Sequence, residues 1–355
     1  MFNPALYSFF LLFVCVGGHA IDGTGLQMSI AGDMTYFQGI NKDSTAGEKM
    51  TMRGAEMVFY APVDHNFNGN LSVAAHDEGG RTFFEIHEMF ISSSKIIGRT
   101  QFKVGRFFLG IGRLNQIHQH DWPFIQAPKV HETFFGSEGV FDDGVQMSHL
   151  LPLGGRYLNF IWGVTSGYRY GHSHTVGSRP RVPLHYFKMD FFQNFSNIDG
   201  LLVGLNYLGR TDGIGNKNRI TGLDVTAKWK KGKKLQYMLQ SEIWHRYQKN
   251  FSNVKNEQAG LYIFNQSSIS DSLLLGFRLD AYRDFSKRNA LTNKKINNIE
   301  YGFTPELSWK SSEFTTIKTG VSHIFTREEG RTIEKDMRFA LQFVFIMGSH
   351  PAHDF

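Results

Sequence analysis

Short segments in which apolar and polar residues alternate follow one another along most of the chain, separated by turns of Gly, Asn, Asp and Ser. The clearest segment covers residues 338–347. Its odd positions from Phe339 to Met347 are all apolar, whereas its even positions begin with Arg338 and include Gln342. Successive side chains of a β-strand point to opposite sides, so a period of two residues is typical of a strand with one apolar face. The pattern predicts an all-β protein.

Three other segments, 185–191, 223–230 and 273–281, alternate in the same way, and the polar face of each carries charged residues. The segments are roughly 10–15 residues long, enough to cross a membrane as tilted strands. In a membrane barrel the apolar face meets lipid and the charged face meets a wet lumen. We therefore expect a transmembrane antiparallel β-barrel, with a soluble β-sandwich as the alternative.

Sixteen segments of this kind can be placed, and their pattern allows about 14 to 18 strands. They cover residues 25–38, 51–61, 69–77, 82–93, 100–109, 143–151, 156–167, 183–194, 199–210, 218–231, 233–247, 256–268, 271–284, 296–310, 313–327 and 332–348. Long and short connections alternate between them, as expected when long loops lie outside the cell and short turns face the periplasm. A barrel of about 22 strands would leave too few residues for each strand and none for a plug domain.

The composition agrees with a membrane barrel. The 355 residues include 33 Phe, 13 Tyr and 5 Trp, more aromatic side chains than a water-facing surface would hold. The mean hydropathy is only −0.28, and after residue 20 no apolar run approaches the roughly 18 residues of a membrane-spanning helix. A chain of this kind crosses a membrane as a closed barrel.

Residues 1–20 have the pattern of an export signal. Positions 5–16 are largely apolar, and small residues at Gly18 and Ala20 fit cleavage after Ala20, although residues 1–4 lack a basic side chain. The single cysteine, Cys15, lies in this segment, so residues 21–355 hold no thiol for a disulfide or a metal. We expect residues 21–355 to form one barrel in the outer membrane of a Gram-negative bacterium.

The charged strand faces identify candidate lumen residues, because charge facing lipid costs a few kcal/mol at the membrane centre. The predicted pore-lining residues are Lys103, Lys188, Asp190, Asp224, Lys228, Arg278, Asp280 and Arg338. Both signs occur, so no strong ion selectivity follows. The net charge of +6 does not indicate nucleic-acid binding, because no basic cluster carries a recognition motif.

The longest connection, at about residues 110–142, is too apolar for an ordinary loop in water. In sixteen-stranded porins the loop at this place folds into the barrel and narrows the pore. Large aromatic side chains need burial, and a lumen offers it. We predict an inward-folding constriction loop; a lid over the barrel mouth is the alternative. The loop residues expected at the constriction are Arg113, Asn115, Trp122, Phe124 and Glu138.

Histidines gather in this loop and the next. Two residues at i and i+2 project to one side of an extended chain, and imidazole with carboxylate is a ligand set for zinc or a similar ion. The candidate metal ligands are His118, His120, Asp121, His131, His172 and His174, and a further histidine, His76, ends the third segment. No spacing matches a closed structural zinc site, so ordinary hydrogen-bonded loop histidines are the alternative.

The same region carries a family resemblance. The motifs are Gly112-Arg113-Leu114-Asn115, His118-x-His120-Asp121-x-Pro123, Phe135-Gly136-x-Glu138-Gly139, Asp143-Gly144-Val145-Gln146 and the C-terminal residues 348–355. They resemble those of Gram-negative outer-membrane barrels described as zinc-regulated, TonB-dependent receptor-like or porin-like proteins. The resemblance covers about residues 105–153 and the last dozen residues. It implies production in response to zinc scarcity and a role in zinc entry.

Two functions are therefore open. The leading prediction is an outer-membrane porin-like channel for small solutes or ions, with no required cofactor and Zn²⁺ as the candidate ion in its constriction loop. The alternative is a zinc-responsive, TonB-dependent receptor-like uptake barrel. An enzyme is not expected, because Ser148 and His149 have no recognisable acid partner.

The expected partners follow from the barrel. They are outer-membrane lipid and lipopolysaccharide around the wall, and the barrel-assembly machinery at the C-terminal strand. The sequence leaves undecided whether three chains assemble into a homotrimer, because apolar strand faces that meet lipid and those that meet protein have the same pattern.

Overall fold

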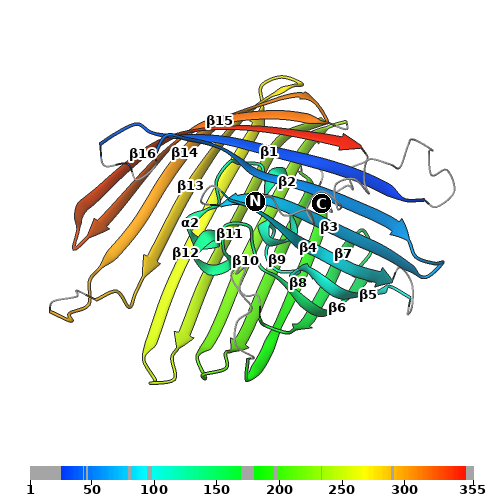
Figure 1. The fold of residues 1–355 in the computed structure, drawn as a ribbon, viewed down its shortest axis with the longest axis horizontal. Coiled ribbons are helices and arrows are strands. Elements are labelled where there is room, and N and C mark those ends of the chain that lie inside the picture. Colours follow the sequence, from blue (N-terminus) through cyan, green and yellow to red (C-terminus); the bar gives the residue numbers. More distant parts are fainter. Residues whose placement is uncertain are drawn as a thin grey trace, which may run out of the picture.

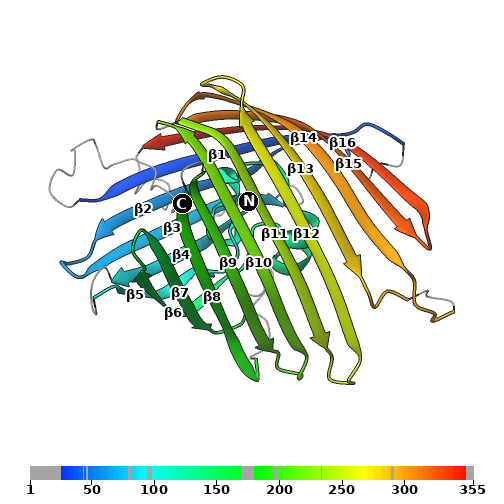
Figure 2. The ribbon, with the colours of Figure 1, turned by 180° about the vertical axis from the view of Figure 1, so that it is seen from behind.

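The structure is a computed structural model that describes residues 25–42, 44, 47–78, 81–93, 98–168, 180–195, 198–232, 234–288 and 292–348. The predicted export segment, His172, His174 and the tail from residue 349 lie outside these residues. Within them, sixteen antiparallel strands form a closed barrel in which β1 pairs with β16 (Figures 1 and 2). None of the described helices is long and apolar enough to cross a membrane.

The strands lie where the alternating pattern predicted them. They are β1 (Gln27–Gly39), β2 (Lys49–Pro62), β3 (Phe67–Glu78), β4 (Arg81–Ser93), β5 (Thr100–Phe108), β6 (Phe141–Pro152), β7 (Arg156–Thr165), β8 (Val182–Phe195), β9 (Ile198–Thr211), β10 (Lys217–Lys231), β11 (Lys234–Lys249), β12 (Lys255–Ser268), β13 (Leu273–Asp284), β14 (Asn298–Ser312), β15 (Thr315–Glu328) and β16 (Arg331–Gly348). The predicted fold, a sixteen-stranded antiparallel barrel, is confirmed.

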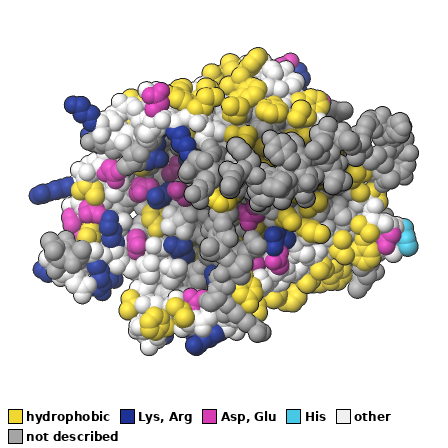
Figure 3. Space-filling view, in the orientation of Figure 1, with side chains coloured by type: hydrophobic (Ala, Val, Ile, Leu, Met, Phe, Trp, Pro, Cys, Tyr) yellow, Lys and Arg dark blue, Asp and Glu magenta, His cyan; other side chains and the backbone are white. Residues whose placement is uncertain are grey.

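Alternation along each strand separates an outer from an inner face. On β16, Leu341, Phe343 and Met347 are exposed, whereas Gln342 and Val344 are buried inside the barrel. Exposed apolar side chains recur around the wall, and Figure 3 shows them gathered over the upper and lower-right edges of that view. An apolar exterior over a polar interior is the arrangement of a barrel surrounded by lipid.

The connections differ at the two ends of the barrel. Those after β2, β6, β10, β12 and β14 are short turns, and we call this the short-turn end. At the opposite end, the long-loop end, the connections after β1, β5, β7 and β13 are much longer. In outer-membrane barrels the short turns face the periplasm.

The connection between β5 and β6, residues 109–140, lies inside the barrel (Figures 1 and 2). We call it the inner loop. It contains three short helices, η1 (Leu114–Gln116), η2 (Gln119–Asp121) and α2 (Lys129–Phe135). Its aromatic side chains pack edge-on against the inner face of β11 and β12: the ring of Phe135 lies 4.8 Å from that of Trp244, and the ring of Phe124 lies 5.7 Å from that of Tyr262. The apolar core of the protein is this contact between loop and wall.

Two β-bulges turn extra polar side chains toward the inner loop. The register between β3 and β4 shifts beside Ser72, which makes His87 an extra residue on β4, and both His87 and Glu88 are buried. A second shift, at Asp33, makes Arg53 the extra residue on β2. A bulge bends the strand and redirects a side chain. Adjacent residues of β4 can therefore both face inward.

Candidate functional site

Histidines and carboxylates from the wall and the inner loop surround one small cavity. We call it the histidine chamber; its residues are Glu56 of β2, His76 of β3, His87 and Glu88 of β4, and His118, His120 and Glu138 of the inner loop. The cavity holds about 30 Å³, enough for a water molecule or an ion.

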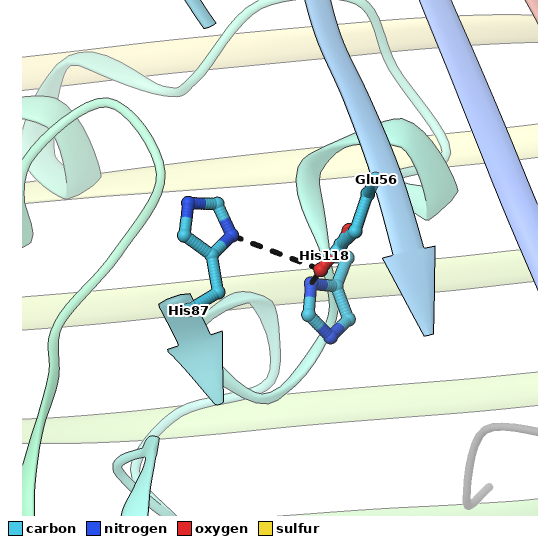
Figure 4. A group of neighbouring side chains, drawn as sticks. All are labelled: Glu56, His87 and His118. Carbon is cyan, nitrogen blue, oxygen red and sulfur yellow. Dashed lines mark ion pairs between the residues drawn. The ribbon is translucent and has the colours of Figure 1, made fainter. Parts of the chain in front are cut away.

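Glu56 stands at the centre of the chamber. Its Oε1 lies 3.0 Å from Nδ1 of His118 and 3.7 Å from Nδ1 of His87, and its Oε2 lies 3.4 Å from Nδ1 of His120. Figure 4 shows Glu56 between His87 of the wall and His118 of the loop. One wall carboxylate thus contacts three imidazoles from two separate parts of the chain.

Glu138 forms a second group on the far side of His87. Its Oε1 lies 3.3 Å from Nδ1 of His76, and its Oε2 lies 3.5 Å from Nε2 of His87. The Nε2 atoms of His76 and His87 are 2.8 Å apart, so one of the two rings donates a hydrogen bond to the other. His87 therefore belongs to both groups, one through each ring nitrogen.

His118 is also held by Glu88, whose Oε2 lies 3.3 Å from its Nε2. Burial disfavours charge on this imidazole, but the carboxylates of Glu56 and Glu88 outweigh burial and raise the pKa of His118 well above its usual value. Glu88 in turn accepts a hydrogen bond from the backbone N–H of Phe108, at 3.2 Å. The loop histidine is thus fixed from both sides by wall carboxylates.

The inner loop divides the lumen into two vestibules. The first, of about 540 Å³, lies toward the long-loop end and is lined by α2 and the adjoining parts of β13–β16. The second, of about 470 Å³, lies toward the short-turn end beneath η2. The chamber shares Arg53 and Gln119 with the first vestibule and His120 with the second. It therefore adjoins both halves of the lumen.

Polar side chains from two neighbouring parts of the wall bond the backbone of the inner loop. From β8 and β11, Lys188 donates to the carbonyl of Gly112 at 2.8 Å, and Glu242 accepts the backbone N–H of Arg113 and Leu114. From β13–β15, Arg278 donates to the carbonyl of Gln126, Glu306 accepts the N–H of Ile125, and Lys318 donates to the carbonyl of Trp122. These bonds fix the loop backbone to the wall at several points.

The structure brings only some of the predicted metal ligands together. His118 and His120 lie in the chamber, and Oδ2 of Asp121 lies 3.1 Å from Nε2 of His120 on the side of the second vestibule. His131 lies apart from them on α2, between the rings of Trp122 and Phe135. Burial lowers its pKa to about 3, so its imidazole is neutral in the folded protein.

The predicted constriction residues have different surroundings. Arg113 lines the second vestibule, and Glu138 lies in the chamber. Trp122 and Phe124 are fully buried in the apolar core. Asn115 ties the base of the loop together, because its side chain bonds the carbonyls of Leu109 and Val140 and the N–H of Val140.

The predicted pore-lining residues also separate into groups. Those beneath the inner loop are buried: Nζ of Lys188 lies 3.0 Å from Asp190 and 3.5 Å from Asp224. Lys103 lies over the ring of Phe90. Those that line a vestibule are Lys228 in the second and Arg278, Asp280 and Arg338 in the first. The inner loop covers one part of the wall and leaves the other open.

Sequence reasoning missed Glu56, His87 and Glu88, and it did not connect His76 with the loop. One signal was present: the alternation of β4 breaks at His87 and Glu88, two polar residues between Ile86 and Met89. Two adjacent polar residues in an otherwise alternating strand indicate a bulge. Glu56 carries no such signal, because any inward carboxylate fits a wet lumen.

Comparisons with known proteins identify the fold. No family model matches the chain. An uncharacterized protein of Aquifex aeolicus (strain VF5) is 27% identical over 340 residues, which cover 85% of this chain and 69% of that protein.

Three solved structures overlay most of the chain. The outer membrane channel DcaP of Acinetobacter baumannii has a TM-score of 0.62 and 11% identity over 93% of this chain and 99% of its own. The anion-selective porin from Comamonas acidovorans has a TM-score of 0.59 and 9% identity, over 92% and 100%. In-vitro folded OmpT of Vibrio cholerae, in its trimer form, has a TM-score of 0.60 and 9% identity, also over 92% and 100%. The chain therefore has the fold of the porin-like outer-membrane β-barrels.

Proposed function

We propose that this protein is a porin-like channel of the outer membrane, which conducts small ions or solutes along a path narrowed by the inner loop. One observation carries the proposal. The inner loop splits the lumen into vestibules of about 540 and 470 Å³, and the histidine chamber adjoins both. A narrow site between two wider parts of a lumen is the geometry of a selective pore.

The comparisons support this proposal through the fold. The similar structures include one described as an outer membrane channel and one described as an anion-selective porin. We propose that the apolar outer face meets lipid and lipopolysaccharide and that the barrel-assembly machinery recognises β16. We also propose that the chains form a homotrimer, for which the trimer form of OmpT is a precedent. Chemical crosslinking in membranes tests the trimer.

The enzyme alternative finds no support in the position of Ser148 and His149. They are neighbours on β6, so their side chains project to opposite sides of the wall. Nδ1 of His149 instead lies 2.9 Å from Oγ1 of Thr100. A nucleophile and its base need to contact each other.

Single-channel recording in a planar bilayer tests the channel. We expect the folded chain to give small, steady openings in a simple salt solution. Replacing residues 116–137 by a short Gly-Ser linker should raise the conductance several-fold, because the two vestibules then merge. Lys234→Gln, at the exposed first residue of β11, which lines neither vestibule, is the control and should leave conductance unchanged.

A barrel that folds, inserts and stays silent in both forms would contradict the channel. If the linker variant does not fold, the milder variant Phe124→Ala takes its place in the experiment. It removes one aromatic anchor of the loop and should give larger or noisier openings than the wild type.

The second candidate is an uptake barrel for zinc. One observation favours it: among the described residues, both groups of three or more closely spaced candidate metal ligands lie in the histidine chamber. A metal cargo would then pass from one vestibule to the other through this chamber.

A further inference from the structure

We propose that the histidine chamber is a binding site for a divalent transition-metal ion such as Zn²⁺, held by Glu56, His87 and His118. The proposal rests on the channel function above and names the class of ion that the narrow part of the path selects. Its ligands differ from the set expected from the sequence, because two of the three come from the barrel wall.

The donor atoms are already close to the spacing that a metal requires. One ligand atom each from Glu56, His87 and His118 lies within 4.8 Å of the others. Ligand atoms of a tetrahedral zinc site lie about 3.3 Å apart, given metal–ligand distances near 2.0 Å. Oε1 of Glu56 lies 3.0 Å from His118 and 3.7 Å from His87. Small side-chain movements therefore suffice to form the site.

The type of donor selects the class of ion. Two imidazoles with a carboxylate suit Zn²⁺, Ni²⁺ and Co²⁺, whereas Mg²⁺ and Ca²⁺ prefer oxygen ligands alone. Residues 21–355 contain no cysteine, so a thiolate site for a softer ion is excluded. The cavity of about 30 Å³ is the size of a single ion.

Glu88 supplies the outer support that metal-binding histidines usually have. Its Oε2 lies 3.3 Å from Nε2 of His118, while Nδ1 of that ring faces Glu56. A carboxylate bonded to the far nitrogen fixes both the orientation and the tautomer of a ligating imidazole. His118 therefore presents Nδ1 to the metal, and Glu88 acts as a positioning residue.

A second position lies next to the first. His76, His87 and Glu138 also place one ligand atom each within 4.8 Å of the others. The two positions share His87, which faces Glu56 through Nδ1 and Glu138 through Nε2. A neutral imidazole ligates through one nitrogen and carries a proton on the other. The two positions are therefore alternatives for one ion, which can step from one side of His87 to the other.

Metal binding by the folded full chain in detergent micelles tests the site without any need for conduction. Titration with Co²⁺ should produce a visible absorption band that saturates at one ion per chain, and Zn²⁺ should remove it. His87→Gln removes a ligand of both positions and should weaken binding at least about 100-fold. Glu88→Gln should weaken it about 10-fold, as expected for a positioning residue.

Matched variants separate this site from other histidines. His245→Gln, at an exposed position on β11, should bind Co²⁺ as the wild type does. If His87→Gln does not fold, the double variant His118→Gln/Glu138→Gln, which removes one ligand of each position, replaces it, with the same expected loss. Absence of Co²⁺ and Zn²⁺ binding by the folded wild type, or binding equal in wild type and His87→Gln, would overturn the proposal.

Conductance recorded without metal tests the channel by itself. Steady openings together with a chain that binds no metal would overturn the metal site and leave the channel standing. If the wild type binds metal saturably, His87→Gln loses this binding and the wild-type barrel never opens, the result would support the metal site and contradict the channel. Zn²⁺ that blocks wild-type openings but not those of His87→Gln would support both.

Discussion

His131 shows at the scale of one residue how a fold decides the chemistry of a side chain. From the sequence it is equivalent to His118, another loop histidine close to acidic residues. The structure gives His118 two carboxylates and gives His131 two aromatic rings. The pKa of His118 is raised, and burial lowers that of His131 to about 3. Such a difference depends on long-range contacts that no local pattern contains.

The low pKa of His131 predicts that acid destabilises the docked inner loop. Between its ordinary pKa near 6.5 and its folded value of about 3, the unfolded state binds a proton that the folded state does not, so stability falls as the pH falls through this window. At pH 5 the loss should be about 2 kcal/mol. Urea unfolding in micelles at pH 7.5 and pH 5 measures it, and His131→Phe should lose less stability than the wild type over the same change. Equal losses in both proteins would show that His131 does not cause it.

Asn115 gives a second prediction at this scale. Its side chain makes hydrogen bonds of 2.8 and 3.0 Å to the carbonyls of Leu109 and Val140, and one of 2.6 Å from the N–H of Val140. Asn115→Ala should cost about 2–3 kcal/mol, because the N–H of Val140 stays buried without its partner. Unfolding in micelles should show this loss, whereas Thr133→Ala, which removes a bond within α2, should cost about 1 kcal/mol or less. Equal losses of stability in the two variants would mean that the hydrogen bonds of Asn115 do not hold the two ends of the inner loop together.

At the scale of strands, the sequence was sufficient for the number, position and faces of β1–β16, because the period of two is a local property. It was insufficient for the chamber, because a bulge depends on how two strands pair. His87 faces inward only as the extra residue of β4. Glu56 and His76 lie near it because β2, β3 and β4 are neighbours in the sheet, and His118 meets them because the inner loop returns to this part of the wall. The sequence therefore did not show that Glu56, His87 and Glu88 belong to the same site as His118.

The pairing of β4 with β5 predicts a weak seam in the wall beside this bulge. Only four residue pairs join the two strands, and one of them is Phe90 with Gly105. Gly105 has a φ of 133°, and a Cβ there would meet the carbonyl of Met89 and lie 2.8 Å from the Cα of Phe90. Gly105→Ala should therefore open the seam and lower the unfolding temperature in micelles by several degrees. Gly47→Ala, where a Cβ meets nothing within 4 Å, is the control. An unchanged transition in Gly105→Ala would show that the seam tolerates the strain.

At the scale of the whole molecule, the inner loop distributes the charged side chains unequally along the lumen. From the sequence alone only their net charge can be obtained. The second vestibule is lined by five basic and two acidic side chains: Arg113, Lys228, Lys230, Lys310 and Lys318 against Asp121 and Glu313. The first vestibule is nearly balanced, and the chamber between them holds Glu56 and Glu138. Charged residues of both signs in the sequence predicted no strong ion selectivity. In the fold they are separated: the vestibule at the short-turn end is basic, and the histidine chamber above it is more acidic.

This asymmetry predicts that the channel rectifies. Fixed charge raises the local concentration of counter-ions, so a pore with a basic vestibule at one end conducts better at one voltage polarity than at the other. The effect should fade as the salt concentration rises and the Debye length shortens. In planar bilayers with equal salt on both sides, Lys228→Gln/Lys310→Gln should bring the currents at opposite polarities closer together, whereas Lys234→Gln at the exposed start of β11 should not. Symmetric currents in the wild type at low salt would show that ions do not pass through the second vestibule, because its charge would then have no effect on them.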